Sequence, residues 1–255
     1  MLHAERHRQI LRLLAERGRL TVAEIRSRLG VSVATARRDA TAIAHSGRAR
    51  RVHGALLPLD FGLDEPRYSR KAEKALAGKV RLGRAVAQLL PEAGTVFLDA
   101  GSTALEVGRA VLDRPQLRLY TNSIPLLALA AEARATIVAL GGEVRPLSLA
   151  LTGALTQHWL ENLRFDVAVI GASGLDPVAG ASTTETAEAA VKTEALRRST
   201  RRILVATGDK WGRPAALRFA PWSSFSDLVT DHLFTRAERL ALNRAGLRLH
   251  APPSR

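Results

Sequence analysis

Apolar side chains recur at helical spacing at the start of the chain. Isoleucine and leucine residues share one side of a helix over residues 3–17, and Gly18 ends that helix. Thr21 is followed three residues later by Glu24, which predicts a capping box and the start of a short second helix. The pattern therefore predicts two helices in quick succession.

A third helix follows after a very short turn. Gly30, Val31 and Ser32 separate the second helix from the third, which Ser32 caps and which extends from Val33 to about Ser46. A short glycine-containing turn lets two helices cross steeply, as in a helix-turn-helix, and presents the polar start of the third helix to a major groove. The DNA contacts expected from these helices are Thr21, Ser32, Val33, Thr35, Arg37 and Arg38.

The segment after Gly47 alternates basic residues with small or apolar ones around turn-forming residues. This pattern is typical of a β-wing that lies along a phosphate backbone, so we expect Arg48, Arg51 and His53 to contact DNA there. A solvated three-helix cap without DNA binding is the alternative. Such a cap does not require the short turn or a basic wing directly behind the third helix.

The charge distribution agrees with a polyanionic partner. The formal net charge is +14, and residues 1–58 carry twelve arginines against four acidic residues, which is more than half of the excess. A general preference for arginine is the alternative explanation, since 33 of the 38 basic residues are Arg. Charge alone therefore favours nucleic-acid binding without establishing it.

Other features of composition exclude whole classes of function. The chain has no cysteine, which excludes disulfides, cysteine-ligated zinc and thiol catalysis. The first residues contain no cleavable apolar segment, and no apolar run approaches the length of about 20 residues that a membrane span requires. We therefore expect a cytoplasmic protein without a membrane partner.

The motif of the third helix resembles that of the DeoR-type family of bacterial transcriptional regulators. The matching residues are Val31-Ser32-Val33-Ala34-Thr35-Ala36-Arg37-Arg38-Asp39, followed by His53-Gly54 at the end of the wing. The chain departs from the family pattern at Ala40, where leucine is usual, and at Ala55, where a second glycine is common. The resemblance implies DNA binding, with repression as the usual mode of action.

The basic zone ends in a segment rich in proline and glycine, where we place the domain boundary. The predicted organisation is a winged helix-turn-helix over residues 1–58, a linker and connecting helix over 59–78, and an effector-sensing domain over 79–255. A helix is predicted from Tyr68 to Leu90. Its lysines are expected to form a solvated face, and they are Lys71, Lys74 and Lys79.

Short apolar runs then alternate with helical stretches, which predicts an α/β domain with a mostly parallel sheet covered by helices. The predicted strands are 96–98, 117–120, 137–140, 167–170, 203–205 and 228–229. Small, hydroxylated and charged residues follow each run. Because the carboxyl ends of parallel strands share one edge of the sheet, we expect these residues to line a crevice for a polar ligand.

The loop after residue 98 is the most specific of these segments. Gly101, Ser102 and Thr103 lie between a strand and a helix predicted over 104–111, and a helix amino terminus with hydroxyls and free amides binds anions. Ordinary capping by Ser102 or Thr103 is the alternative.

The later loops supply the other candidate ligand contacts. Arg145 is placed to hold a carboxylate or phosphate bidentately, although the two glycines before it are also consistent with a tight turn. Residues 182–185 are predicted to open a helix with a capping box, and Glu188 with Lys192 forms either part of the site or a surface salt bridge. The remaining candidates are Asp99, Thr121, Asn122, Ser123, Gly142, Gly171, Ser173, Gly174, Thr184, Glu185, Lys192 and Lys210.

These loops also resemble the DeoR-type sensor domain, which is similar in fold to ribose-5-phosphate isomerase and whose effectors are usually phosphorylated sugars. The resemblance implies that 101–103 hold phosphate with Lys210 nearby. It also implies sugar-hydroxyl contacts from Asp99, Asn122 and Glu185. Departures from the family pattern fall around the sugar, at Ser173 and at residues 207–209.

The sequence thus favours a ligand-responsive repressor that acts as a homo-oligomer, either dimer or tetramer, on double-stranded DNA. We expect no catalytic residue, cofactor or metal. The alternatives are a sugar-phosphate isomerase-like enzyme with an accessory DNA-binding module, for which Asp99, Asp176 and Glu185 are available acids, and a nonspecific nucleic-acid compactor.

Overall fold

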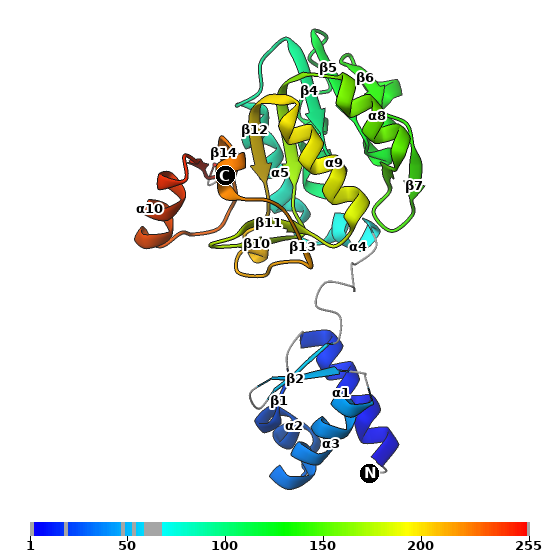
Figure 1. Ribbon diagram of the computed structural model, residues 1–255, viewed down its shortest axis with the longest axis vertical. Helices are drawn as coiled ribbons and strands as arrows, with labels where there is room; N and C mark the ends of the chain where they lie inside the picture. Colours follow the sequence, from blue (N-terminus) through cyan, green and yellow to red (C-terminus); the bar gives the residue numbers. More distant parts are fainter. Residues whose placement is uncertain (1–2, 18–19, 47–48, 53–54, 59–67, 254–255) are drawn as a thin grey trace. The chain divides into compact units, whose positions relative to one another are not determined.

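The computed structural model describes residues 3–17, 20–46, 49–52, 55–58 and 68–253. The chain forms two compact units, Met1–Asp64 and Glu65–Arg255, which are drawn in Figure 1 and are described separately below.

The smaller unit is a winged helix-turn-helix, as predicted. Helices of this unit pack over a three-stranded antiparallel sheet of order β1-β3-β2 in the described residues. Ile10, Ile25, Ile43 and Leu56 are fully buried between the helices and the sheet, because each occupies the inward side of its element. The elements are α1 (His3–Arg17), β1 (Leu20–Thr21), α2 (Val22–Leu29), α3 (Val33–His45), β2 (Ala49–Val52) and β3 (Ala55–Pro58).

Local hydrogen bonds begin both helices of the motif where the sequence predicts. The Thr21 hydroxyl accepts the Glu24 amide while the Glu24 carboxylate accepts the Thr21 amide at 2.8 Å, so the capping box is confirmed. Ser32 caps α3 by accepting the Thr35 amide at 3.1 Å. Gly30 takes a left-handed conformation with φ 63° and ends α2.

A buried ion pair fixes α3 against α1. The Asp39 carboxylate accepts hydrogen bonds from the Arg6 guanidinium at 2.8 and 3.0 Å, and His7 Nε2 lies 3.3 Å from its second oxygen. Burial alone would raise the pKa of Asp39, but the hydrogen bonds and charges of Arg6 and His7 lower it. Asp39 therefore orients the recognition helix from its inner side.

The larger unit contains a seven-stranded parallel sheet within the described residues, with order β15-β14-β12-β9-β4-β5-β6. All six predicted strands are present, and β15 is an additional edge strand that the sequence pattern did not reveal. The strands are β4 (Gly94–Leu98), β5 (Leu117–Thr121), β6 (Thr136–Ala139), β9 (Phe165–Gly171), β12 (Ser199–Val205), β14 (Asp227–Val229) and β15 (Arg248–His250).

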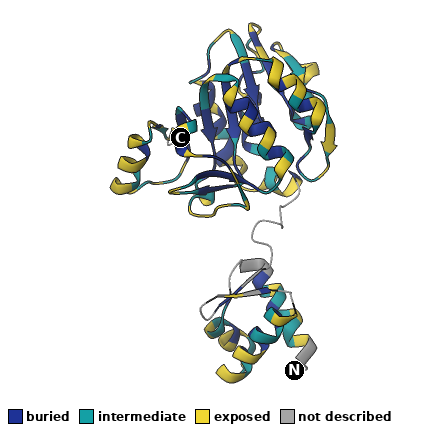
Figure 2. Cartoon of the chain, in the orientation of Figure 1, coloured by how far each residue is buried: buried dark blue, intermediate teal, exposed yellow. Residues whose placement is uncertain are grey.

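Helices cover both faces of this sheet, so the central strands are buried, as Figure 2 shows. One face packs against α5 (Leu76–Ala87), α6 (Ser102–Arg109) and α7 (Ile124–Leu127). The opposite face packs against α8 (Ala154–Asn162) and α9 (Thr186–Arg197). The predicted α/β class is thereby confirmed.

Short elements outside the main sheet complete the unit. They comprise an antiparallel sheet of order β10-β11-β13, the hairpin β7-β8 and the helix α10 against β15. Their bounds are β7 (Glu143–Arg145), β8 (Ala150–Thr152), β10 (Gly174–Asp176), β11 (Gly180–Thr183), β13 (Leu217–Ala220) and α10 (Arg236–Arg244).

Three local predictions were wrong. The helix predicted from residue 68 to 90 is two helices, α4 (Tyr68–Glu73) and α5, because Ala75 takes a left-handed conformation with φ 54°. Lys79 is buried, with 5% of its surface exposed, and does not belong to a solvated face. Residues 182–183 lie in β11, and Glu185 caps α9 without the predicted capping box.

The strand order places a switch point in the middle of the sheet. From β4 the chain proceeds outward through β5 and β6, and it then returns to β9 on the other side of β4 before continuing to β12. Loops after β4 and β9 therefore leave the sheet in opposite directions and open a crevice at the carboxyl edge.

Candidate functional site

Three arginines surround a groove on the smaller unit. The groove has a volume of about 540 Å³ and is lined by Val22, Ala23, Arg26, Val33, Arg37 and Arg51. These residues come from α2, α3 and β2, so the recognition helix and the wing form one basic concavity. Such a surface suits a phosphate backbone entering beside the recognition helix.

The predicted DNA contacts divide into exposed groups and caps. Val33, Arg37 and Arg38 are exposed on α3. Ser32 is also exposed, but its hydroxyl serves as the cap, as does that of Thr21, while Thr35 is half-buried and supplies its amide. Arg48 and His53 lie outside the described residues.

The wing and the recognition helix are connected by hydrogen bonds. The Arg51 guanidinium donates to the Thr41 hydroxyl, which itself donates to the Arg37 carbonyl at 2.8 Å. Arg26 was missed by the sequence reasoning. The available signal was its place in the last turn of a helix that packs beside the recognition helix.

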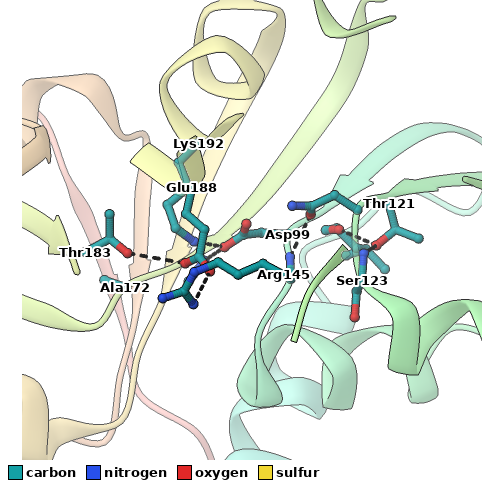
Figure 3. Close-up of polar contacts among 12 residues, drawn as sticks. Asp99, Thr121, Ser123, Arg145, Ala172, Thr183, Glu188 and Lys192 are labelled. Carbon is teal, nitrogen blue, oxygen red and sulfur yellow. Dashed lines mark hydrogen bonds and ion pairs between the residues drawn. The ribbon is translucent and has the colours of Figure 1, made fainter. Parts of the chain in front are cut away.

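Asp99 lies at the carboxyl end of β4, at the switch point of the larger sheet. Its carboxylate accepts the Gly171 amide at 2.9 Å and a hydrogen bond from Lys192 of α9, as Figure 3 shows. Burial raises the pKa of Asp99, and the adjacent Lys192 ammonium opposes this effect. The contact joins loops from the two strands that border the crevice.

Residues 121–123 hold that loop in place from inside. The Asn122 side chain accepts the Ala100 amide at 2.8 Å and donates to the Leu151 carbonyl at 3.2 Å. Thr121 donates to the Leu98 carbonyl at 2.7 Å and accepts the Ser123 amide at 3.0 Å. All three are buried, so in this structure they position the phosphate-loop candidate through backbone contacts.

A second ion pair borders the crevice. The Arg145 guanidinium donates to Glu188 at 3.1 Å, and the Thr183 hydroxyl donates to the same carboxylate at 3.5 Å (Figure 3). The predicted alternative of a surface salt bridge between Glu188 and Lys192 is therefore wrong, because Lys192 pairs with Asp99.

Glu185 is committed to a local structural role in this structure. Its carboxylate accepts the Glu188 amide at 3.0 Å at the start of α9. Burial would raise the pKa of Glu185, but backbone hydrogen bonds from Ala187 and Glu188 lower it. Thr184, just before it, is half-buried.

The glycine candidates have packing roles. A Cβ on Gly142 would lie 2.1 Å from the Thr156 hydroxyl, and one on Gly174 would lie 2.0 Å from the Arg213 carbonyl. The tight-turn explanation is thus sufficient for Gly142, whose φ is 113°. Ser173 donates its amide to Ser182 in the antiparallel sheet at 2.9 Å.

The phosphate-loop candidate is open. Gly101 caps α6 with its backbone, and among the described residues no side chain completes that cap, so capping by Ser102 or Thr103 is wrong. A Cβ on Gly101 would meet no atom within 4 Å, which leaves space beside the loop. Thr103 is buried, whereas the half-buried Ser102 donates its hydroxyl to the Lys71 carbonyl at 3.3 Å.

The lysines of the chain gather around this loop, although they come from three distant segments. Lys210 experiences the charges of the others directly, and burial together with neighbouring lysines lowers its pKa to about 8. Burial likewise lowers the pKa of Lys79. The chain has five lysines against 33 arginines, and the five are Lys71, Lys74, Lys79, Lys192 and Lys210.

The two lysines with lowered pKa values donate to backbone oxygens. Lys79 donates to the Lys71 carbonyl and Lys210 to the Ala172 carbonyl. Within the described ranges neither forms an ion pair with a carboxylate, in contrast to Lys74 with Asp209 and Lys192 with Asp99. Buried ammonium groups without a counter-charge favour an anionic ligand.

Searches for other kinds of site gave no candidate. Within residues 3–253, apart from the gaps given above, no three histidine, aspartate or glutamate side chains converge as metal ligands would. No helix in the described part of the chain has the length and apolar character needed to cross a membrane.

Comparisons with known proteins agree across the whole chain. Residues 6–59 match the DeoR-like helix-turn-helix domain and residues 74–232 match the DeoR C terminal sensor domain. The chain is 32% identical to the HTH-type transcriptional regulator GlpR of Haloferax volcanii over 97% of both chains. It is 28% identical to the glycerol-3-phosphate regulon repressor of Escherichia coli, over 91% of this chain and 92% of the repressor.

A partial likeness extends to ribose 5 phosphate isomerase A from Neisseria gonorrhoeae, with a TM-score of 0.39, 15% identity and coverage of 52% of each chain. The two domain matches cover most of the sequence in the order that the structure shows, and they coincide with the winged helix-turn-helix and the parallel α/β unit. This chain belongs to the DeoR family of helix-turn-helix transcriptional regulators.

Proposed function

We propose that this regulator represses transcription and that a phosphorylated small molecule, of the sugar-phosphate class, changes its affinity for DNA. Residues 1–58 bind the operator, 59–78 connect the domains and 79–255 bind the effector. The observation that carries this proposal is the pair of lysines with lowered pKa values, Lys79 and Lys210, beside the open Gly101-Ser102 loop.

Phosphate suits these groups better than a neutral ligand does. Ser102 offers a hydroxyl, the start of α6 offers backbone amides, and the lysines offer charge without a carboxylate partner among the described residues. A dianion bound there restores the favourable charge balance that both lysines lack. The names of relatives such as the glycerol-3-phosphate regulon repressor are consistent with this class of ligand.

The arrangement of carboxylates favours binding over catalysis. Asp99 is engaged by Lys192 and the Gly171 amide, and Glu185 by the start of α9. A general base needs a lone pair directed at substrate, and these contacts use the carboxylates for positioning. Sugar hydroxyls remain able to accept from Arg145 or donate to these carboxylates at the crevice.

DNA recognition uses the groove around α3. We propose that the exposed face of α3, with Arg37 and Arg38, enters the major groove while Arg26 and Arg51 contact phosphates on either side. Helix-turn-helix proteins usually read two half-sites, so the functional form is a homo-oligomer.

A thermal-shift screen tests the effector proposal. Sugar phosphates, sn-glycerol 3-phosphate and the unphosphorylated parents are compared on the wild-type protein and on Lys210→Met, with Lys74→Met as the matched control. A phosphate-dependent shift that Lys210→Met removes and Lys74→Met keeps supports the proposal. Equal shifts from the phosphorylated and parent sugars contradict it, and turnover of a sugar phosphate identifies an enzyme instead.

Operator binding is then measured with the ligand found in the screen. The full-length protein is titrated with DNA from its own upstream region, at several salt concentrations, in the presence and absence of that ligand. A ligand-dependent change in affinity supports regulation by this site. An unchanged affinity shows that the ligand does not control DNA binding.

A further inference from the structure

The short helix α4 is attached at both ends to segments of the proposed effector site. At its start, the Tyr68 amide donates to the Leu147 carbonyl at 2.9 Å, two residues after Arg145. At its end, the Lys71 carbonyl accepts from both the Ser102 hydroxyl and the Lys79 ammonium. The helix thus contacts the crevice through two backbone groups.

The Lys71 carbonyl occupies the position that suits an anion. It accepts from a hydroxyl of the phosphate-loop candidate and from a buried ammonium, and these are the donors that a phosphate oxygen prefers. A neutral carbonyl compensates the Lys79 charge weakly, and burial accordingly lowers the pKa of Lys79. A phosphate dianion is a stronger acceptor for the same two donors.

The chain around α4 is divided in a way that allows the helix to move. Ala75 takes φ 54°, a left-handed conformation that is unfavourable for alanine, and it separates α4 from α5. The helix α5 is held in the core by fully buried side chains such as Leu82 and Val86. Movement of α4 therefore does not require repacking of α5.

We propose that the Lys71 carbonyl stands in for the effector's phosphate in the free protein, and that the bound phosphate takes over Ser102 and Lys79 and releases the end of α4. This inference rests on the proposed phosphate site. It adds Lys79 as a ligand-binding residue and makes α4 the element that detects occupancy. The chain reaches α4 directly from the DNA-binding unit through residues 59–67, so the released helix changes how that unit is tethered.

Hydrogen exchange on the full-length protein, with inorganic phosphate as the probe, tests this exchange of partners. The expected result is slower exchange for the amides of residues 102–105 and about tenfold faster exchange for the last turn of α4. One such amide is that of Lys74, which donates to the Arg70 carbonyl at 3.2 Å. Urea in place of phosphate controls for non-ionic effects.

Two lysine variants separate the role of Lys79 from a general loss of charge. Lys79→Gln removes a donor to the Lys71 carbonyl, so we expect faster exchange at the end of α4 without phosphate and a loss of about tenfold or more in phosphate affinity. Lys74→Gln removes an exposed lysine that pairs with Asp209. It is expected to keep slow exchange in α4 and most of the affinity.

The outcomes distinguish this proposal from the proposed function. If phosphate protects residues 102–105 while α4 exchanges as before, the release of α4 is wrong and the phosphate site stands. If phosphate alters neither segment, both are overturned. The wild-type comparison needs no variant, so a folding defect in Lys79→Gln does not prevent the decision.

Discussion

Replacement of Lys210 by methionine should make the free protein more stable and the ligand-bound protein less so. Burial and the neighbouring lysines lower the pKa of Lys210 from 10.5 to about 8. At about 1.4 kcal/mol per pH unit, the charged form is about 3 kcal/mol less favourable in the folded chain than in water. Lys210→Met removes this penalty at pH 7.

The net gain is smaller than the penalty, because the variant also loses a hydrogen bond. Lys210 donates to the Ala172 carbonyl, and such a bond contributes about 1 kcal/mol. We therefore expect the free energy of unfolding of the larger unit to increase by about 2 kcal/mol, which corresponds to a rise of about 4–8 °C in its melting temperature. Lys74→Met, at an exposed position, should leave it nearly unchanged.

The pH dependence gives a second, opposite signature. A lysine with a lowered folded-state pKa destabilises the folded chain fully below that pKa, and the penalty disappears as the pH rises from about 8 to 10.5. Stability of the wild type without ligand should thus contain a component that increases across this window. Phosphate affinity should decrease by about tenfold per pH unit above 8, because the anion requires protonated Lys210.

Thermal unfolding with and without inorganic phosphate, from pH 7 to about 9, measures both effects. Stabilisation by a ligand grows with its concentration relative to its dissociation constant, so the phosphate-induced shift reports affinity. The reasoning is refuted if Lys210→Met is less stable than the wild type at pH 7. It is also refuted if phosphate stabilises the variant and the wild type equally.

Three further substitutions test other parts of the structure. Arg26→Ala should weaken operator binding about equally for all sequences and reduce the slope of its salt dependence by about one, and an unchanged slope would place Arg26 away from the phosphates. Asp39→Ala leaves Arg6 without its partner and should destabilise the smaller unit by about 3 kcal/mol in urea unfolding, with a control at the exposed Arg38. Asp227→Asn should lose stability near neutral pH and much less near pH 2. Burial would raise the pKa of Asp227, but hydrogen bonds from Arg201, His250 and Arg248 lower it to about 2, so its contribution is present above about pH 4 and disappears as the pH falls towards 2. A pH-independent loss would show that packing, and not the ion pairs, is responsible.

The sequence by itself determined the features that depend on near neighbours in the chain. Helix starts at Thr21 and Ser32 follow from side chains three residues away from the amides they accept, and the turn at Gly30 follows from its freedom at positive φ. Strands of the main sheet were predictable for a similar reason, since runs of buried apolar residues mark them directly. The family resemblance rested on the same local motifs.

The break at Ala75 was not predictable in this way. Apolar periodicity continues through α4 and α5 with no glycine or proline at the break, so the pattern alone indicates one helix. The same is true of Glu185, whose preceding Ser182 and Thr183 resemble a cap but belong to β11. Tertiary pairing of that strand overrode the local signal.

The charge arrangement of the site was decided by the tertiary structure alone. Lys192 is 93 residues away from Asp99, and the two meet because α9 packs over the sheet at the position where β9 lies beside β4. Strand order depends on which long-range pairings bury the most apolar surface, and no periodicity in the chain encodes it. For this reason the sequence could place ligand-type residues at one edge of the sheet, but only the fold determined which of them neutralise one another and which remain for an anion.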